Sequence, residues 1–318
     1  MSPTTPAEHA RRRDPGPPEI VEVAPSVYAY LQPDGTWWIN NAGFIAGPDR
    51  VTLIDTCSTE ARTRALLAAV SDASPNPIAT IVNTHHHGDH TNGNGLAATP
   101  GATTIVAHHD CRTILAEEGI VHYDGVWEPV DWGELPLGLP TTTFADRLTL
   151  WSGDRRIELR HPGVAHTTND VVAWLPDDGV LFTGDLVFHG GTPFILMGSV
   201  QGALESVEFL RSFEATTVVP GHGPLCGPDV FDVHERYFRF VLDLAAQAHA
   251  AGTPALEAAR AADLGEFAEL SDPERLVGNL HRALAELSGT ERGGAIDLVT
   301  AIGEMISFNG GRPLACCA

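Results

Sequence analysis

Basic side chains are scarce in this sequence. Its 318 residues include 19 lysines and arginines against 41 aspartates and glutamates, which gives a formal net charge of −22. Such a surface would repel a nucleic acid and an anionic membrane alike. Apolar runs are short as well, and none approaches the roughly 20 residues that a transmembrane helix needs. The composition therefore predicts a protein without a nucleic-acid partner and without a membrane association.

The sequence also lacks a disulfide pattern. Its five cysteines include no CxxC pair and no regular framework, which is typical of a reducing compartment. Three arginines at residues 11–13 precede a proline-rich stretch and not the apolar segment of an export signal. We therefore interpret residues 1–19 as a flexible N-terminal arm, and we expect the protein to be cytoplasmic.

Strand-like and helix-like segments alternate from about residue 20 onward. Short β-branched runs such as 51–55 and 78–83 predict buried strands, and residues 58–70 predict a helix. Residues 120–143 have no clean period and predict a long irregular excursion, which is usually functional or mobile.

The last third of the chain has a different pattern. Beyond residue 228, apolar side chains recur every three or four positions and predict helices that bury one face. Together the patterns predict an α/β core at residues 20–228, with a helical C-terminal part at residues 229–318 packed on it.

A run of six polar and small residues, HHHGDH, directly follows one of the predicted strands. Residues i and i+2 of an extended chain point the same way, so His85 and His87 can bind one metal ion together. Gly88 lets the backbone turn, so that Asp89 and His90 face a second ion. Histidines beside a carboxylate suit zinc or iron. A solvated polar loop is the alternative, but four potential ligands after a buried strand are rare by chance.

Three more candidate ligands each sit in a turn just after a predicted strand: His166, Asp185 and His222. Each signal is weak alone, because a lone histidine is more often structural. Together they place polar side chains at the ends of successive strands, where open sheets form their sites. Within the histidine run, His86 is the one expected to point away from the metals.

With these residues in view, the sequence resembles the metallo-β-lactamase superfamily, whose HxHxDH signature matches residues 85–90. The resemblance implies a four-layered αββα sandwich and a site for two zinc ions, with iron or manganese as alternatives. Asp55 matches the acidic residue that orients the site from behind the ligands. The implied ligands are His85, His87 and His166 for the first ion, Asp89, His90 and His222 for the second, and Asp185 between them.

A site of this kind supports two sorts of chemistry. Two cations about 3.5–4 Å apart share a bridging water and lower its pKa toward neutrality, which yields a hydroxide nucleophile. The same ions polarise a carbonyl and stabilise a developing oxyanion.

Other segments carry a closer resemblance. Residues 130–134, 144–150, 190–194, 198–200 and 308–313 are similar to the metallo-β-lactamase-like cyclases of bacterial aromatic (type II) polyketide pathways, of the actinorhodin type, which serve antibiotic biosynthesis. This family implies an aldol condensation and dehydration that close a later ring of a poly-β-ketone. It also implies thioesterase activity that releases the product from a transiently bound acyl carrier protein. The α-proton would pass to the bridging hydroxide, or to Asp89 if it is freed from its metal, with Asp185 as the bridging ligand.

Two other functions stay open. One is a general thioester or lactone hydrolase of the same fold, similar to glyoxalase II. The other is a non-catalytic scaffold, against which the complete ligand set argues. The sequence is compatible with a homodimer. Apolar residues near the bridging aspartate and in the irregular excursion are candidates for the substrate pocket, with core packing as the alternative: Phe188, Phe194, Met197, Trp127 and Trp132.

Overall fold

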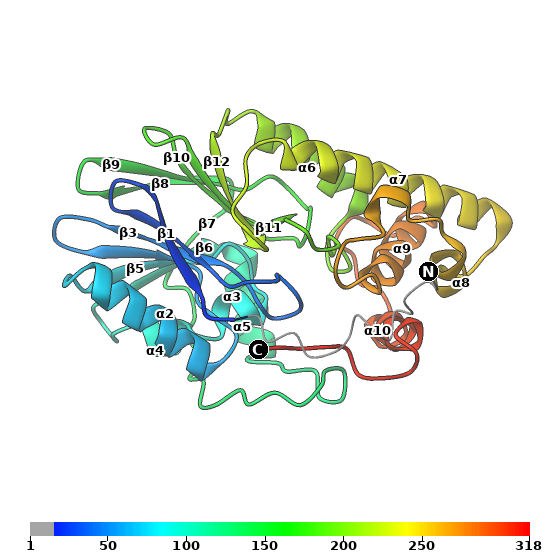
Figure 1. The fold of residues 1–318 in the computed structure, drawn as a ribbon, viewed down its shortest axis with the longest axis horizontal. Coiled ribbons are helices and arrows are strands. Elements are labelled where there is room, and N and C mark those ends of the chain that lie inside the picture. The colour runs from blue at the N-terminus through cyan, green and yellow to red at the C-terminus, as the bar shows by residue number, and fades with distance from the viewer. Residues whose placement is uncertain (1–15) are drawn as a thin grey trace.

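The computed structural model of the protein describes residues 16–318, so the expected arm at residues 1–19 lies mostly outside the described residues (Figure 1). Two β-sheets face each other. The larger sheet has its strands in the order β1-β2-β3-β4-β5-β6-β7. These strands are β1 (Glu19–Ala24), β2 (Val27–Leu31), β3 (Ala42–Ala46), β4 (Val51–Ile54), β5 (Ile78–Val82), β6 (Thr104–His108) and β7 (Thr142–Phe144).

The smaller sheet has its strands in the order β12-β11-β10-β9-β8. They are β8 (Arg147–Ser152), β9 (Arg155–Arg160), β10 (Val172–Leu175), β11 (Val180–Phe188) and β12 (Thr217–His222). Strands β8 to β11 pair antiparallel, whereas β11 and β12 run parallel.

Helices cover the outer face of each sheet (Figure 1). Those near the larger sheet are α2 (Glu60–Ala73), α3 (Gly88–Thr91), α4 (Asn94–Ala97) and α5 (His109–Glu118). On the side of the smaller sheet lie α6 (Val200–Arg211) and α7 (Val230–Ala251). The helices α8 (Ala255–Ala261), α9 (Arg275–Leu287) and α10 (Leu298–Phe308) pack on α7 or on one another beyond the sheets, at the right of Figure 1, with a 3₁₀ turn at Gly265–Phe267. The N-cap of helix α2 is Thr59, whose side chain accepts a hydrogen bond from the backbone N–H of Arg62.

Apolar side chains fill the three spaces between these four layers. Between the sheets, Val82 of the larger sheet and Ile157 of the smaller belong to one buried cluster. Leu66 and Val70 of α2 pack in a second cluster with Leu53 of β4. A third cluster joins the smaller sheet to α6, α7 and α9. The structure therefore confirms the predicted α/β class, with the C-terminal helices packed on the core. Among residues 16–318, no helix combines the length and apolarity that crossing a bilayer requires.

The parallel strands position the candidate ligands. Strands β4, β5 and β6 run parallel in the larger sheet, so their carboxyl ends share one edge. Asp55 follows β4 at this edge, and the histidine run follows β5. The parallel pair β11 and β12 brings ligands from the smaller sheet to the same region. Ligand sites in open α/β sheets form outside such strand ends.

Several boundaries differ from those expected from the sequence. Strand β1 begins at Glu19, inside the expected arm, and β7 lies at the end of the expected irregular excursion. Asp185 lies within β11 and not after its end, because this strand continues to Phe188 through two register shifts. His222 is likewise the last residue of β12. Strand pairing across the sheet decides these ends, and local composition does not reveal it.

Candidate metal centre

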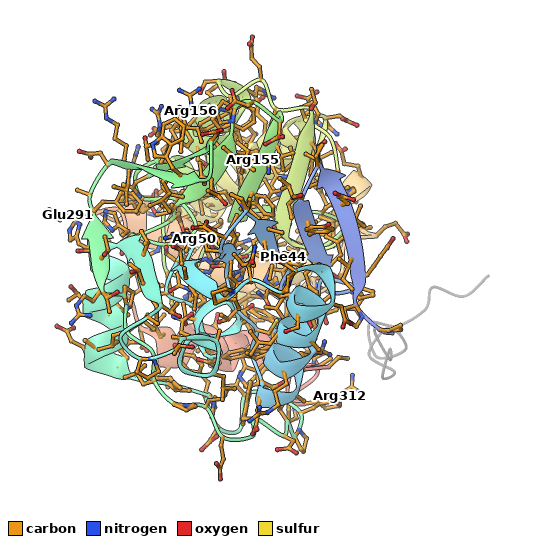
Figure 2. All side chains as sticks on the ribbon, turned by 90° about the vertical axis from the view of Figure 1, so that its left-hand side faces the viewer. Phe44, Arg50, Arg155, Arg156, Glu291 and Arg312 are labelled. Atoms are coloured by element: carbon orange, nitrogen blue, oxygen red, sulfur yellow. The ribbon has the colours of Figure 1, made fainter. Side chains whose placement is uncertain are left out.

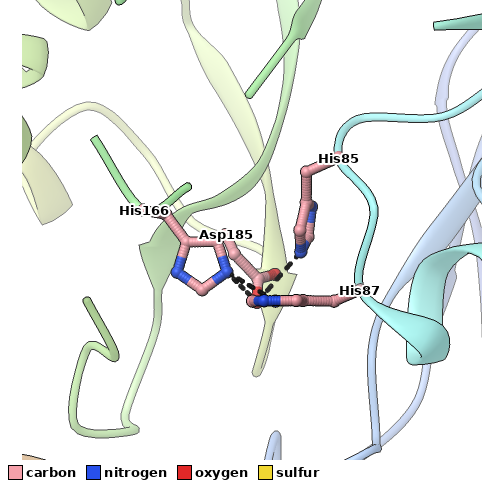
Figure 3. Close-up of side chains that lie close together, drawn as sticks. All are labelled: His85, His87, His166 and Asp185. Carbon is pink, nitrogen blue, oxygen red and sulfur yellow. Dashed lines mark hydrogen bonds and ion pairs between the residues drawn. The ribbon is translucent and has the colours of Figure 1, made fainter. Parts of the chain in front are cut away.

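The first group of candidate ligands gathers around the Asp185 carboxylate (Figure 3). One nitrogen from each of His85, His87 and His166 lies within 4.8 Å of the others and of a carboxylate oxygen of Asp185. Asp185 Oδ2 is 3.4 Å from His166 Nε2 and 3.9 Å from His85 Nε2. His87 ends the extended segment after β5 and is the N-cap of the single-turn helix α3.

A second group lies on the other side of Asp185. Helix α3 carries Asp89 and His90, and β12 supplies His222, with the three ligand atoms again within 4.8 Å of one another. His222 Nε2 is 3.2 Å from Asp89 Oδ2 and 3.3 Å from Asp185 Oδ2. Asp185 Oδ1 is 3.0 Å from His90 Nε2. Asp185 therefore contacts both groups, as a ligand shared between two ions would.

Unpaired polar atoms show that these residues fit metal ions. His85 Nε2, His90 Nε2 and Asp185 Oδ1 are buried without a hydrogen-bond partner, because the 3.0 Å contact between the last two lacks hydrogen-bond geometry. Buried polar atoms are normally paired, so such a cluster points to a missing ligand. Imidazole nitrogens and carboxylate oxygens are donors that zinc accepts. The donor set is thus suited to a dinuclear metal site.

Asp55 orients one of the histidines from behind. Its Oδ2 accepts a hydrogen bond from His90 Nδ1–H at 2.8 Å, and both of its oxygens accept bonds from Thr84, one from the backbone N–H and one from the hydroxyl. With the Nδ1–H of His90 directed at Asp55, the Nε2 atom on the side of Asp185 is the one that a metal ion would bind. Such carboxylate–histidine pairs fix the tautomer of a metal ligand.

Backbone carbonyls and one amide fix two further ligands. His166 Nδ1–H donates to the carbonyl of Phe194, which turns its Nε2 toward Asp185. Asn41 brackets His222: its side-chain amide donates to the carbonyls of Pro220 and Gly223, at 2.9 and 2.7 Å. Asn41 carries no recognisable motif, so sequence reasoning did not find it.

The buried ionisable groups of the site shift one another's pKa values. Burial and repulsion by neighbouring His90 lower the pKa of His85 well below its usual value. At His222 burial acts in the same direction, but the carboxylates of Asp185 and Asp89 outweigh it and raise the pKa to about 9. Burial would raise the pKa of Asp185, yet His222 and His90 beside it lower that pKa well below the usual value. Asp185 is therefore ionised, the form that binds metal.

Two glycines leave room for the shared aspartate. Gly184 has φ +51°, and a Cβ there would lie 2.6 Å from the Thr84 hydroxyl oxygen. A Cβ on Gly221 would lie 2.0 Å from Asp185 Oδ1. Only glycine permits both the left-handed backbone and the close approach of the strands.

A pocket of about 1000 Å³, partly open to solvent, leads to the metal groups. Aromatic and aliphatic residues from distant segments form most of its wall, including Trp37, Trp38, Trp127, Phe188, Phe194, Leu196, Met197, Ile302, Met305 and Leu314. Four of the five predicted pocket residues are thus in the wall. The contributions of α10 and of Leu314 carried no local signal in the sequence, because apolar helix positions look alike whether they face a core or a cavity.

One expectation about this region was wrong. Trp132 is not among the residues that line the pocket: it packs behind Trp38, with ring centres 4.8 Å apart, and stacks on His122. His86 belongs to neither ligand group, in agreement with the expectation that it points away from the metals, and its Nδ1 lies 3.0 Å from the Asn169 amide nitrogen. It nevertheless lines the pocket, which was not expected from the sequence.

A two-sheet sandwich with a dinuclear His/Asp centre at its edge defines a class of metal-dependent hydrolases. The family model of the metallo-beta-lactamase superfamily matches residues 35–222. The chain belongs to this superfamily.

Characterised relatives differ in the reactions that their names describe. The chain is 24% identical over 225 residues to a metallo-beta-lactamase type 2 of Bacteroides fragilis. This match covers 67% of this chain and 82% of the relative. It is 32% identical over 140 residues to a hydroxyacylglutathione hydrolase of Methylococcus capsulatus. That match covers 44% of this chain and 45% of the relative, so the chain corresponds to less than half of that enzyme.

A solved structure supports the fold. A metallo-beta-lactamase from Pontibacter korlensis superposes with a TM-score of 0.58 at 21% identity, covering 70% of this chain and 99% of the other. At this identity the likeness establishes the fold and not the substrate.

Proposed function

We propose that the protein is an aromatic polyketide cyclase with thioesterase activity. It would close a later ring of a poly-β-ketone by intramolecular aldol condensation and dehydration, and release the product from an acyl carrier protein by hydrolysis. The observation that carries this proposal is the wide, aromatic-lined pocket that ends at the dinuclear site. Flat polycyclic substrates bury large apolar surfaces, and pockets for them are lined by apolar and aromatic side chains.

The site residues have distinct roles in this proposal. Two divalent ions, when bound, supply Lewis-acid polarisation of carbonyl oxygens and an activated water. Asp89 belongs to the second ligand group and also lines the pocket, so its carboxylate could take the α-proton of a bound 1,3-dicarbonyl once it is freed from its metal ion. The resulting carbanion attacks a second carbonyl of the chain, and loss of water then gives the aromatic ring. Trp37 and Trp127 hold the substrate flat and exclude solvent.

The experiment compares two thioesters with purified, metal-loaded enzyme. We expect a synthetic bicyclic poly-β-ketone thioester to give a cyclised, dehydrated acid and a free thiol, and a chelator to abolish both products. Product masses separate cyclisation from plain hydrolysis. If the enzyme turns over S-lactoylglutathione briskly and leaves the bicyclic thioester unchanged, the proposal is wrong.

Hydrolysis of a glutathione thioester is the second candidate, favoured by the similarity to hydroxyacylglutathione hydrolases. The scarcity of positive charge in the pocket argues against a glutathione thioester as the substrate. Among the described residues that line the pocket, Arg275 is the only arginine or lysine, and its guanidinium is already paired with Asp272 at 2.9 Å. Glutathione carries two carboxylates, which this wall does not neutralise.

A carrier protein would dock beside the pocket mouth. A basic patch for this contact is not available at Arg282, which is buried, or at Arg236 and Arg239, which are paired with Glu266 and Glu235. Figure 2 shows the side of the molecule that lies opposite the C-terminal helices, and it labels Arg50, Arg155 and Arg156 there. These three arginines are also paired with acidic neighbours.

Arg312 offers a better contact for the carrier. It is exposed, enters no ion pair within residues 16–318, and lies two residues from the pocket-lining Leu314. Reversal of its charge, Arg312→Glu, should raise KM for a carrier-bound substrate and leave KM for the free thioester unchanged. An equal effect on both substrates would exclude Arg312 as a carrier contact.

A further inference from the structure

Helix α9 lies outside the stretch that the family model matches, and it buries three polar side chains among its apolar ones. Arg275, Asn279 and Arg282 are at most 2% exposed. They are spaced i, i+4 and i+7, so they share one side of the helix. Burying three such side chains is costly unless each is fully hydrogen-bonded, and their partners therefore indicate what this face is for.

All three side chains bond to the backbone of one loop, residues 192–197, which connects β11 to α6. Arg275 donates to the carbonyl of Thr192 at 3.0 Å. Asn279 donates to the carbonyl of Pro193 at 2.7 Å and accepts from the N–H of Ile195 at 2.8 Å. Arg282 donates to the carbonyl of Leu196 at 2.9 Å. Four bonds from one helix therefore fix the backbone of this loop.

This loop has two tasks at the metal centre. The carbonyl of Phe194 accepts the Nδ1–H of His166 and so sets the tautomer and the direction of that ligand. The side chains of Phe194, Leu196 and Met197 form part of the pocket wall. A loop that shifts would therefore change both the metal affinity and the shape of the pocket.

The same helix also reaches the other ligand group. The Arg275 guanidinium lies 4.2 Å from the centre of the Trp37 ring and 5.1 Å from that of Phe188. Phe188 in turn stacks on His222, with ring centres 5.0 Å apart and planes 11° apart. Cation–π contacts of a desolvated arginine are among the stronger of their kind, so this stack holds a ligand of the second group from behind.

We infer that α9 is a positioning element of the active site: Arg275, Asn279 and Arg282 hold the 192–197 loop, and through it His166 and the pocket wall, in the geometry that metal binding and substrate recognition need. Asn279 and Arg282 do not line the pocket and act through the loop, whereas Arg275 also lines the pocket wall. The inference rests on the metal site of the proposed function, but it does not depend on which substrate the pocket takes.

The test compares Asn279→Ala with a matched control, Leu280→Ala, in the full chain. Leu280 is the adjacent residue of α9 and is fully buried, but the helical repeat points it away from the loop face. Its truncation opens a cavity in the core and destabilises the fold at least as much as the loss of the Asn279 amide. Both variants are loaded with zinc in competition with a chelating dye, and with cobalt(II) for the visible absorption spectrum.

We expect Asn279→Ala to weaken binding of one of the two zinc ions by about 10- to 100-fold and to alter the cobalt spectrum, as loss of a partner behind a ligand does. Leu280→Ala should keep wild-type zinc affinity and spectrum. Wild-type zinc affinity in Asn279→Ala, or an equal loss in Leu280→Ala, would overturn the inference. If Asn279→Ala does not fold, the milder Asn279→Ser, which retains a hydroxyl donor, gives the same comparison.

A kinetic measurement adds the second half of the inference. With whichever thioester the wild-type enzyme hydrolyses, Asn279→Ser at saturating zinc should raise KM several-fold more than it lowers kcat, because the wall formed by Phe194 moves. A fall in kcat alone would contradict the role in pocket shape. The zinc and cobalt readings need no substrate, so they remain decisive even if the enzyme acts on no polyketide thioester and the proposed function fails.

Discussion

Exchange of Asp55 for asparagine should uncouple one histidine from its metal while leaving the fold intact. The carboxylate is 2% exposed and accepts three hydrogen bonds, two from Thr84 and one from His90. Asparagine has the same shape and tolerates the left-handed backbone of this position, where φ is +59°. Its oxygen can keep the bond from the backbone N–H of Thr84. Its NH₂ group then faces His90 Nδ1. This group is a hydrogen-bond donor, whereas Oδ2 of Asp55 at the same place is an acceptor.

The expected consequence is a change of tautomer. A donor opposite Nδ1 favours the imidazole with its proton on Nε2, and Nε2 is the atom that faces Asp185 at 3.0 Å. A protonated Nε2 has no lone pair for a metal. Loss of such a partner typically weakens metal affinity by about 10- to 100-fold, or about 1.4 to 2.7 kcal/mol.

Thermal unfolding at fixed free zinc measures this loss. At a free zinc concentration of 100 times the wild-type Kd of the site that contains His90, binding there stabilises the wild type by about 2.7 kcal/mol, whereas a site with 100-fold weaker affinity contributes only about 0.4 kcal/mol. The part of the zinc-dependent rise in Tm that comes from this site should therefore almost vanish in Asp55→Asn, while the part that comes from the group of His85, His87 and His166 remains. Metal-free wild type and variant provide the baselines.

Asp170 supplies a matched control. It is equally buried, and its two oxygens accept bonds from the backbone N–H and the hydroxyl of Thr167, just as those of Asp55 do from Thr84. Its carboxylate bonds to no histidine side chain among the described residues. Asp170→Asn should lower the metal-free Tm and keep most of the zinc-dependent rise. A full zinc-dependent rise in Asp55→Asn would refute the reasoning.

Three further predictions concern stability and the pocket. Burial lowers the pKa of His234 to about 4, whereas its value in the unfolded chain is about 6.5. The native state therefore binds fewer protons than the unfolded state between these values. The contribution of His234 to the free energy of unfolding is complete above about pH 6.5 and falls by roughly 3 kcal/mol toward pH 4. Urea unfolding of His234→Gln, whose carbonyl can still accept from the N–H of Phe188, should therefore lose less stability between pH 7 and 4.5 than the wild type does. Gly184→Ala should cost about 2–4 kcal/mol in the same assay, because a Cβ at φ +51° meets Thr84, and a cost below 1 kcal/mol would contradict the fit. Trp127→Ala should raise KM for a bulky aromatic thioester about tenfold and leave zinc stoichiometry at two, and an unchanged KM would remove this residue from the substrate wall.

Metal ligands were accessible to sequence reasoning because they combine rare residue types with strand ends. The histidine run begins three residues after the end of β5, His166 follows β9 in a loop, Asp185 lies within β11, and His222 ends β12. The structure brings all seven into two adjoining groups. The exact register was not accessible: Asp185 lies inside β11, and strand pairing through two register shifts decides where its carboxylate points.

Pocket residues were harder to predict from the sequence than metal ligands, for a physical reason. Phe194 and Met197 could be proposed because they follow the shared aspartate closely in the sequence. The wall from α10 and Leu314 could not, since a buried apolar side chain looks the same in a sequence whether a core or a ligand covers it. Trp132 was assigned to the pocket by its type and its neighbourhood, and packing against Trp38 removes it from the wall.

By itself, the sequence determined the chemistry that the protein can host. The identity and local spacing of the histidines and aspartates determined which donor atoms a metal ion would meet. The periodicity of the apolar residues determined an α/β core followed by helices. Tertiary structure alone decided how these donors are aimed, because orientation depends on partners far apart in the chain. Asp55 turns His90, Asn41 brackets His222, and Asn279 holds the loop whose carbonyl turns His166. Local sequence patterns do not predict these contacts, because each is a hydrogen bond that forms only after the layers have packed.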